Sequence, residues 1–127
     1  MTTDAGDDGR PSIVRLSERQ LEAYNRADLE AFCACYHPDI EVLGADGQRV
    51  HRGGAAFRAA YGAMFEAHDE VRGVVDGRVV LGEHVVEREH WSRVVRATGE
   101  RRQGSVLVRY SEQDGLIRVA QFLAPRA

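Results

Sequence analysis

The sequence predicts an α+β fold, with helices in the first half of the chain and an antiparallel meander of long strands in the second. Up to about residue 68, apolar residues recur at the three- and four-residue spacing of amphipathic helices. After Asp69 they alternate with polar residues in valine-rich runs separated by turn residues, which is typical of strands. A chain of 127 residues, 43% of them hydrophobic and 29% charged, is large enough for one globular domain with its own core.

The first residues differ in composition from the rest of the chain. Residues 1–11 are acidic and lack periodicity, so we expect a flexible N-terminal tail followed by a single domain over residues 12–127. The tail has no signal-peptide pattern and no apolar run reaches membrane-spanning length, so we expect a cytoplasmic protein. The 17 basic residues are scattered and the net charge is -3, so neither nucleic acid nor a membrane is an expected partner.

Helical patterns precede the strands. Helices are predicted over residues 13–26, 29–36 and 55–68. The apolar arc of the first helix also contains Gln20 and Tyr24, which are therefore expected to face the interior. Asp28 is suited to cap the second helix, and Pro38 ends it because proline disfavours helix at the residue before it.

The strand pattern begins with a short hairpin and continues as a meander. Strands are predicted over residues 40–43, 48–51, 70–81, 84–96, 101–111 and 116–123. The turn sequences between them, such as LGEH and SEQDGL, favour tight antiparallel connections.

The turn at residues 82–83 predicts which side chains face the core. If this turn is a two-residue loop, Leu81 pairs with His84, and uninterrupted alternation then divides the following strand into two faces. The predicted core-facing residues are His84, Val86, Arg88 and His90. The predicted outward-facing residues are Glu87, Glu89 and Trp91.

The last hairpin is predicted in the same way. A four-residue loop over residues 112–115 pairs Ser111 with Leu116. Continued alternation then places Gln121 opposite Val106 on the core-facing side.

Several segments resemble landmarks of a known superfamily: YNRADLEAFCACYHPDIEV, HRGGAAFRAAYGAMF, LGEHVVEREH and VRYSEQDGLIRVAQF. Together with the order of elements, they resemble the nuclear transport factor 2-like superfamily, in particular its steroid delta-isomerase-like and SnoaL-like (polyketide cyclase-like) members. The resemblance implies a cystatin-like α+β fold, in which three N-terminal helices wrap a cone-shaped, curved antiparallel sheet around a small-molecule pocket. It does not imply one activity, because this fold hosts isomerases, dehydratases, cyclases and non-enzymatic binding modules.

The catalytic residues of ketosteroid isomerases are not kept. By the resemblance, the helical tyrosine would fall at Gln20, the general-base aspartate near Gly44 and the second oxyanion donor at Val106. A proton shuttle between two carbons needs at least the base, so ketosteroid isomerase activity is not expected.

His90 is the candidate catalytic residue, and Arg88 is a candidate substrate-binding residue. The ordinary pKa of a histidine lies near neutrality, so an inward-facing His90 can act as an acid or a base; the alternative is a hydrogen-bonded structural histidine. An inward-facing Arg88 cannot stay unpaired, so it must meet a carboxylate of the protein, pocket water, or an anionic or carbonyl-bearing ligand.

The other candidate substrate-binding residues are polar groups expected near the interior: Gln121, Gln20, Tyr24 and His51. A buried amide needs hydrogen-bond partners, so Gln121 on an apolar face indicates a pocket. Tyr24 is otherwise a core residue and His51 otherwise a loop residue. No metal site is predicted, because Glu87 and Glu89 alternate with His90 and the three cannot converge.

The expected function is binding of a small apolar carbonyl-type ligand in the pocket, with no cofactor. The activity would be that of a lyase, cyclase or isomerase with His90 as acid and base. The alternative is a non-enzymatic ligand-binding or dimerisation module. Trp91 on the outer face of the sheet predicts a homodimer through that face, since large exposed aromatic residues mark association surfaces.

Overall fold

A computed structural model describes residues 9–124 of the chain. The expected N-terminal tail falls largely on residues 1–8, which lie outside the described residues. No helix within residues 9–124 is long and apolar enough to cross a membrane. The cytoplasmic location stays a prediction.

The elements follow the predicted order of helices, short hairpin and long strands. They are α1 (Ser12–Asn25), α2 (Leu29–Cys33), β1 (Tyr36–Leu43), β2 (Arg49–Arg52), α3 (Gly54–Ala67), β3 (His68–Leu81), β4 (His84–Val95), β5 (Arg101–Gln113) and β6 (Leu116–Leu123). Helix α2 is shorter than expected, because the chain is already extended at Tyr36, ahead of Pro38.

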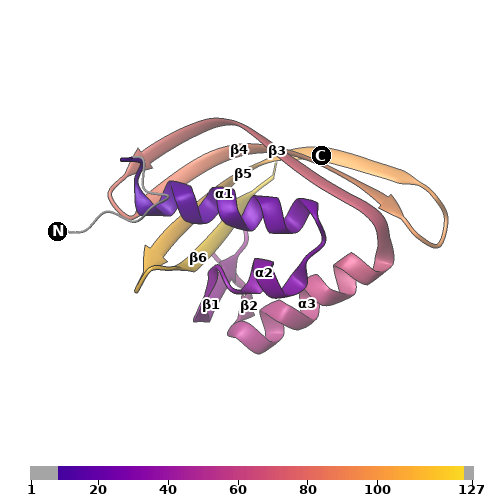
Figure 1. The fold of residues 1–127 in the computed structure, drawn as a ribbon, viewed down its shortest axis with the longest axis horizontal. Helices are drawn as coiled ribbons and strands as arrows, with labels where there is room; N and C mark the ends of the chain where they lie inside the picture. The colour runs from indigo at the N-terminus through magenta and orange to yellow at the C-terminus, as the bar shows by residue number, and fades with distance from the viewer. Residues whose placement is uncertain (1–8, 125–127) are drawn as a thin grey trace.

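The six strands form one curved sheet in the order β2-β1-β6-β5-β4-β3. The long strands arch over α1, and α2 and α3 lie on the same, concave side (Figure 1). All neighbouring strands run antiparallel except β1 and β6, which run parallel. The predicted α+β fold is confirmed, with a mixed sheet in place of a wholly antiparallel one.

An aromatic cluster fills the space between α2, α3 and β1. Phe32 is 1% exposed, and its ring centroid lies 5.6 Å from that of Phe57, 5.0 Å from Tyr36 and 4.7 Å from Tyr61. Tilted and offset rings at these distances attract each other beyond the burial of their surface. The cluster holds Tyr61 in place, and Tyr61 lines the cavity described below.

The β3–β4 hairpin keeps the predicted register only near its turn. Leu81 pairs with His84 across the two-residue loop, as expected, and regular pairing continues as far as Gly77. There the register shifts by one residue, which leaves Asp76 unpaired in a β-bulge before Val75.

This bulge places Val71 and Val75 on the opposite face of β3 from Val79 and Leu81, whereas uninterrupted alternation would place all four on one face. Without the bulge, the half-buried Val75 would pair with His90; with it, Val75 pairs with Glu89. Glu89 and Trp91 therefore face the helices, whereas Arg88 and His90 face outward. The predicted inward placement of Arg88 and His90 is wrong, and so is the outward placement of Trp91.

The β5–β6 hairpin also differs from the prediction. It turns at Asp114 and Gly115, whose φ angles of 56° and 76° suit a two-residue type I′ turn, in place of a four-residue loop. Gln121 consequently lies opposite Arg109 rather than Val106. The predicted inward placement of Gln121 is wrong as well.

Candidate functional site

A cavity of about 140 Å³ lies between α1 and the concave face of the sheet. Its lining residues are Gln20, Leu21, Tyr24, Phe32, Tyr61, Glu89, Trp91, Arg93, Val106, Tyr110, Phe122 and Ala124. An engineered protein cavity of about 150 Å³ admits benzene, so the space suits a ligand of roughly one ring in size.

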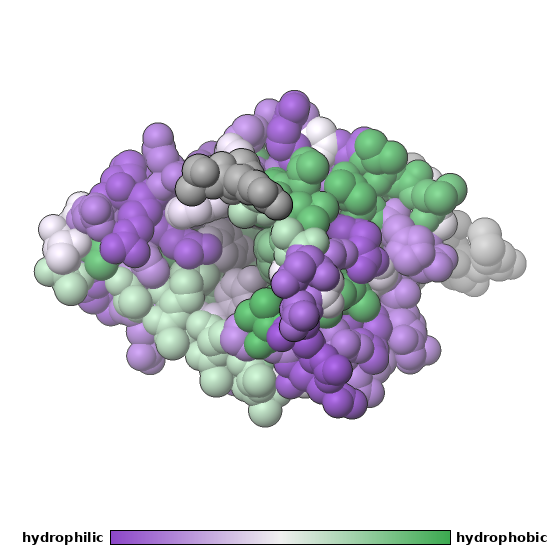
Figure 2. All heavy atoms as spheres, turned by 180° about the vertical axis from the view of Figure 1, so that it is seen from behind, coloured by the Kyte–Doolittle hydropathy of each residue, from purple (hydrophilic) through white to green (hydrophobic). Residues whose placement is uncertain are grey.

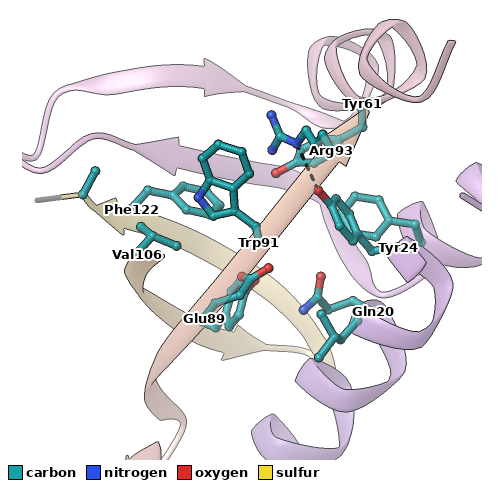
Figure 3. Close-up of a pocket in the computed structure, with 12 residues that line it drawn as sticks. Gln20, Tyr24, Tyr61, Glu89, Trp91, Arg93, Val106 and Phe122 are labelled. Carbon is teal, nitrogen blue, oxygen red and sulfur yellow. Dashed lines mark hydrogen bonds between the residues drawn. The ribbon is translucent and has the colours of Figure 1, made fainter. Parts of the chain in front are cut away.

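Strand β4 brings three chemically distinct side chains to this cavity. Alternate residues of a strand share one face, so Glu89, Trp91 and Arg93 all line the cavity, with the Trp91 ring on the side of Val106 and Phe122 (Figure 3). The wall is thus an acid, an aromatic ring and a cation in a row.

Glu89 presents an uncommitted carboxyl group to the cavity. Within residues 9–124 it makes no hydrogen bond or salt bridge, and Gly73 leaves it room, since a Cβ there would lie 2.5 Å from Glu89 Oε2. Burial, reinforced by the charge of Glu87 and opposed by that of Arg93, raises the pKa of Glu89 from 4.5 to about 7. Glu89 can therefore both hold and release a proton near neutral pH, unlike an ordinary glutamate.

Glu87 lies on the same face but is fully engaged in structure. It is 1% exposed, and its carboxylate accepts hydrogen bonds from Ser17 Oγ at 2.6 Å and from Arg78 Nε at 2.6 Å. These bonds join α1, β3 and β4 and satisfy both oxygens of the buried carboxylate. Glu87 contributes charge near the cavity but is not a free acid.

Hydroxyl and amide groups complete the polar lining. Gln20 Oε1 accepts a hydrogen bond from the Tyr36 hydroxyl at 2.9 Å, and Tyr36 shares another with Tyr110. The Tyr24 hydroxyl accepts from Arg93 Nε at 3.3 Å, so its own proton stays free to donate. Burial raises the pKa of Tyr24, which keeps the hydroxyl protonated.

Arg93 and Trp91 form a stacked pair at one end of the cavity. The Arg93 guanidinium carbon lies 4.8 Å from the centroid of the Trp91 ring, a cation–π contact. The ring in turn lies over Gly104, where a Cβ would come within 2.9 Å of it. Within the described part of the chain, Arg93 has no carboxylate at salt-bridge distance.

A second, more apolar hollow of about 370 Å³ opens beside the cavity. It is lined by Val42, Leu43, Gly44, Val50, His51, Ala60, Tyr61, Met64 and Phe122. Tyr61 and Phe122 line both spaces, so these two aromatic side chains lie between the cavity and the second hollow.

The structure brings only some of the predicted site residues together. Gln20 and Tyr24 line the cavity, and His51 lines the second hollow. Gln121 lies on the outer side, where it accepts a hydrogen bond from Arg109 Nε at 3.2 Å and donates one to the Gly44 carbonyl at 3.1 Å.

Arg88 and His90 instead form an exposed cluster on the convex face. Arg88 Nε donates to Asp76 Oδ1 at 2.6 Å, and His90 Nε2 lies 2.8 Å from Asp76 Oδ2. His90 Nδ1 lies 2.7 Å from Ser105 Oγ. The protein carboxylate expected as the alternative partner of Arg88 is therefore Asp76, the bulged residue.

Four cavity residues were not predicted as such: Tyr61 on α3, and Glu89, Trp91 and Arg93 on β4. For the residues of β4, the missing signal was the Asp76-Gly77 pair in β3, because glycine and aspartate are depleted in strands and a glycine there often marks a bulge. A bulge at that position turns the β3 residues on its two sides to opposite faces, so the valines before and after it do not mark the same face as the inner one.

The structure gives no indication of a metal centre in the region it describes. Among residues 9–124, no group of three or more histidine, cysteine, aspartate or glutamate side chains is placed to hold a metal ion. Glu87 and Glu89 face the helices while His90 faces outward, so this part of β4 does not bring the three to one point.

Comparison with known families gives one match that covers most of the chain. The model of the SnoaL-like domain matches residues 17–120. A comparison with curated protein sequences gives no match.

Solved structures of the same fold are similar over nearly the whole chain. The Delta 5-3-ketosteroid isomerase of a Mycobacterium species has a TM-score of 0.81 and 19% identity, covering 91% of this chain and 95% of that one. An uncharacterised cystatin-fold protein of Novosphingobium aromaticivorans has a TM-score of 0.79 and 20% identity, covering 91% and 99%. An LEH-like epoxide hydrolase of M. tuberculosis has a TM-score of 0.78 and 18% identity, covering 90% and 83%. At such low identity these likenesses establish the fold alone.

Proposed function

Because this chain belongs to the SnoaL-like domain family of the nuclear transport factor 2-like superfamily, we propose that it is a small-molecule enzyme whose acid–base residue is Glu89. The substrate is an apolar carbonyl compound, and the reaction is a proton transfer of the lyase, cyclase or isomerase type. The observation that carries the proposal is the uncommitted carboxyl of Glu89, whose pKa of about 7 lies where an acid–base catalyst works best at neutral pH.

The chemistry follows from the groups around the cavity. The Glu89 carboxylate removes a proton from a carbon next to the carbonyl group, and the electrons of the broken C–H bond move onto the carbonyl oxygen. The Tyr24 hydroxyl, whose proton is free, donates a hydrogen bond to that developing negative charge. The protonated Glu89 then returns the proton to the same carbon or to another one, so the carboxylate is regenerated.

The shape and fold support chemistry on a compact apolar molecule. Leu21, Phe32, Val106 and Phe122 surround the polar groups, which is the usual composition of a small-molecule site. Structural neighbours named as an isomerase and as an epoxide hydrolase place enzymes on this fold.

Exchange of α-protons in deuterated water tests the proposal without knowledge of the natural substrate. Cyclohexanone serves as the probe, and NMR follows the loss of its α-proton signal. We expect the wild-type protein to accelerate exchange and Glu89→Gln to lose about 100-fold of that acceleration. The exposed loop variant Glu83→Gln is the matched control and should exchange like wild type. Equal exchange by wild type and Glu89→Gln would reject Glu89 as the acid–base residue.

A ligand-binding protein without chemistry is the second candidate. One observation favours it: Gln20, Tyr36 and Tyr110 already hydrogen-bond to one another, which leaves few free groups besides Glu89 and Tyr24. In that case apolar carbonyl compounds would raise the melting temperature of the protein, while neither wild type nor Glu89→Gln would exchange α-protons.

We also propose a homodimer, formed through the convex face of the sheet without Trp91. Val74, Val79, Leu81 and Leu107 are 44%, 73%, 79% and 44% exposed. Viewed from behind, hydrophobic surface gathers at the side of the β3–β4 hairpin (Figure 2). Sedimentation at micromolar concentration tests the proposal, and Leu81→Glu should shift a dimer to monomer; a wild-type monomer contradicts it.

A further inference from the structure

Arg93 is a cation at the cavity for which the described residues supply no salt-bridge partner. We propose that Arg93 anchors an anionic group of the ligand, so that the substrate class narrows to small apolar carbonyl compounds that carry a carboxylate. The carbonyl part of this inference rests on the function proposed for Glu89. The anchoring part rests on Arg93 alone.

The guanidinium of Arg93 is held in one orientation. Its Nε donates to the Tyr24 hydroxyl at 3.3 Å, and its guanidinium carbon lies over the Trp91 ring, 4.8 Å from the ring centroid. Both contacts leave the terminal Nη atoms without a partner among residues 9–124. A fixed planar fork with free terminal N–H groups is the arrangement that binds a carboxylate through two parallel hydrogen bonds.

Other arginines of the same sheet show what is missing at Arg93. Arg78 and Arg88 each donate from Nε to a carboxylate at 2.6 Å, and Arg118 pairs with Glu41 at 3.1 Å. Arg93 is half-buried and lines the cavity, yet its Nε meets only a neutral hydroxyl. A partly desolvated charge without a salt-bridge partner favours binding an anion from solution.

Glu89 is not that salt-bridge partner. It shares the concave face of β4 with Arg93, but the two are four residues apart along the strand, a Cα separation of about 13 Å. Their side chains do not form a salt bridge, and Trp91 projects between them (Figure 3).

Arg93, Trp91 and Glu89 follow one another along β4 in an order that suits an anionic group, an apolar ring or chain, and a reacting carbon of one ligand. A carboxylate held at Arg93 leaves an adjoining ring or chain against Trp91 and directs the far end of the molecule toward Glu89. An acidic C–H bond at that far end would meet the Glu89 carboxylate, and the carbonyl group beside it would lie on its Arg93 side, toward the Tyr24 hydroxyl. The polar ends of the cavity therefore specify a molecule with an anion at one end and the reacting carbon at the other.

Benzoate and benzamide test the anchor, because they have nearly the same shape and differ in charge. Binding is measured by isothermal titration at pH 7 with the full chain. We expect benzoate to bind wild type more tightly than benzamide, and Arg93→Gln to weaken benzoate by at least about tenfold while changing benzamide by less than about twofold. Arg72→Gln, which removes an exposed arginine of β3, is the matched control and should bind both probes like wild type.

A conservative variant separates the anchor from a loss of packing. Arg93→Lys keeps the charge and loses the planar fork, so it should retain more benzoate affinity than Arg93→Gln. Equal weakening of benzoate and benzamide by Arg93→Gln, or a wild-type preference for benzamide, would overturn the anchor.

Glu89→Gln separates this inference from the proposed function. If Glu89→Gln binds benzoate at least as tightly as wild type, the anchor stands, even where no α-proton exchange is found. If exchange requires Glu89 but benzoate binding is unaffected by Arg93→Gln, the proposed function stands and the anchor fails.

Discussion

The two faces of β4 carry similar residue types in opposite environments. On the convex face, Arg88 and His90 both contact Asp76, and the three side chains are 58%, 45% and 46% exposed. On the concave face, Glu87 is 1% exposed and paired, whereas Glu89 is enclosed and has no partner among the described residues. One strand therefore has a solvated ion cluster on one side and a perturbed acid on the other.

The comparison teaches that a conspicuous cluster of charged residues is not by itself a site. Exposed ion pairs are screened by water and salt and change stability little, so the convex cluster needs no function to persist. Enclosure changes the same chemistry, because burial and a neighbouring charge move the pKa of Glu89 to the pH at which proton transfer is useful. The variants below test this contrast.

The largest effect is expected from Glu87→Ala. It leaves Ser17 Oγ and the Arg78 guanidinium without their shared acceptor, and removing one partner of a buried ion pair costs about 3 kcal/mol. Urea unfolding measures the loss. Arg88→Ala on the convex face is the control and should cost no more than about 1 kcal/mol. Similar losses for the two variants would mean that the two faces do not differ in this way.

The next effect is a pH dependence of stability that belongs to Glu89. Its pKa is about 7 in the folded protein and 4.5 ordinarily, so between these values the folded state holds a proton that the unfolded state has released. Its stabilising contribution is thus complete below pH 4.5 and is lost as the pH rises through 7, by an amount on the order of 2 kcal/mol. Unfolding curves at pH 5 and pH 8 measure this loss: between these pH values the free energy of unfolding should fall more in wild type than in Glu89→Gln. If stability falls equally with pH in the two proteins, the Glu89 side chain is exposed to water in the folded state.

Local signals explain why the elements could be predicted. Apolar periodicity identified α1 and α3, and the turn residues 82–83 gave the pairing of Leu81 with His84 that the structure confirms. The superfamily resemblance gave the curved sheet, because the order of elements and the quoted segments extend along almost the whole chain. These features depend on residues close together in the sequence.

The faces of β4 could not be read from the same signals. Identifying the inner face of the hairpin from the valines of β3 requires knowing that one residue of β3 is skipped in the pairing, because Val71 is buried whereas Val79 and Leu81 are exposed. Gln20 and Tyr24 were correctly placed at the cavity because α1 is regular throughout. Arg88 pairs with Gly77 in the predicted register, so its misplacement comes from taking the wrong face of the hairpin as the inner one; His90 would be the partner of the half-buried Val75 only without the bulge.

Alanine substitutions of the two glycines on either side of the bulge, Gly73 and Gly77, should change stability by smaller amounts and in opposite directions. A Cβ at Gly73 would lie 2.5 Å from Glu89 Oε2 and 2.9 Å from Leu21 Cδ1, so Gly73→Ala must displace both side chains at a cost of about 1–2 kcal/mol. A Cβ at Gly77 meets nothing closer than Arg88 Nη2 at 3.8 Å, so Gly77→Ala should be neutral or slightly stabilising. Thermal unfolding of both variants checks the difference. Destabilisation by Gly77→Ala but not by Gly73→Ala would mean that Gly77, rather than Gly73, faces the packed concave side.

The smallest effect is expected from His90→Ala, which removes the most conspicuous acid–base residue of the sequence. Its imidazole contacts Asp76 and Ser105 on the convex face, where loss of an exposed side chain changes stability by less than about 0.5 kcal/mol. The sheet separates it from the cavity, so α-proton exchange should match wild type, while Glu89→Gln, one residue away, loses it. The two adjacent substitutions thereby measure which face of β4 performs the chemistry. Loss of exchange in His90→Ala with normal exchange in Glu89→Gln would mean that the chemistry takes place on the convex face.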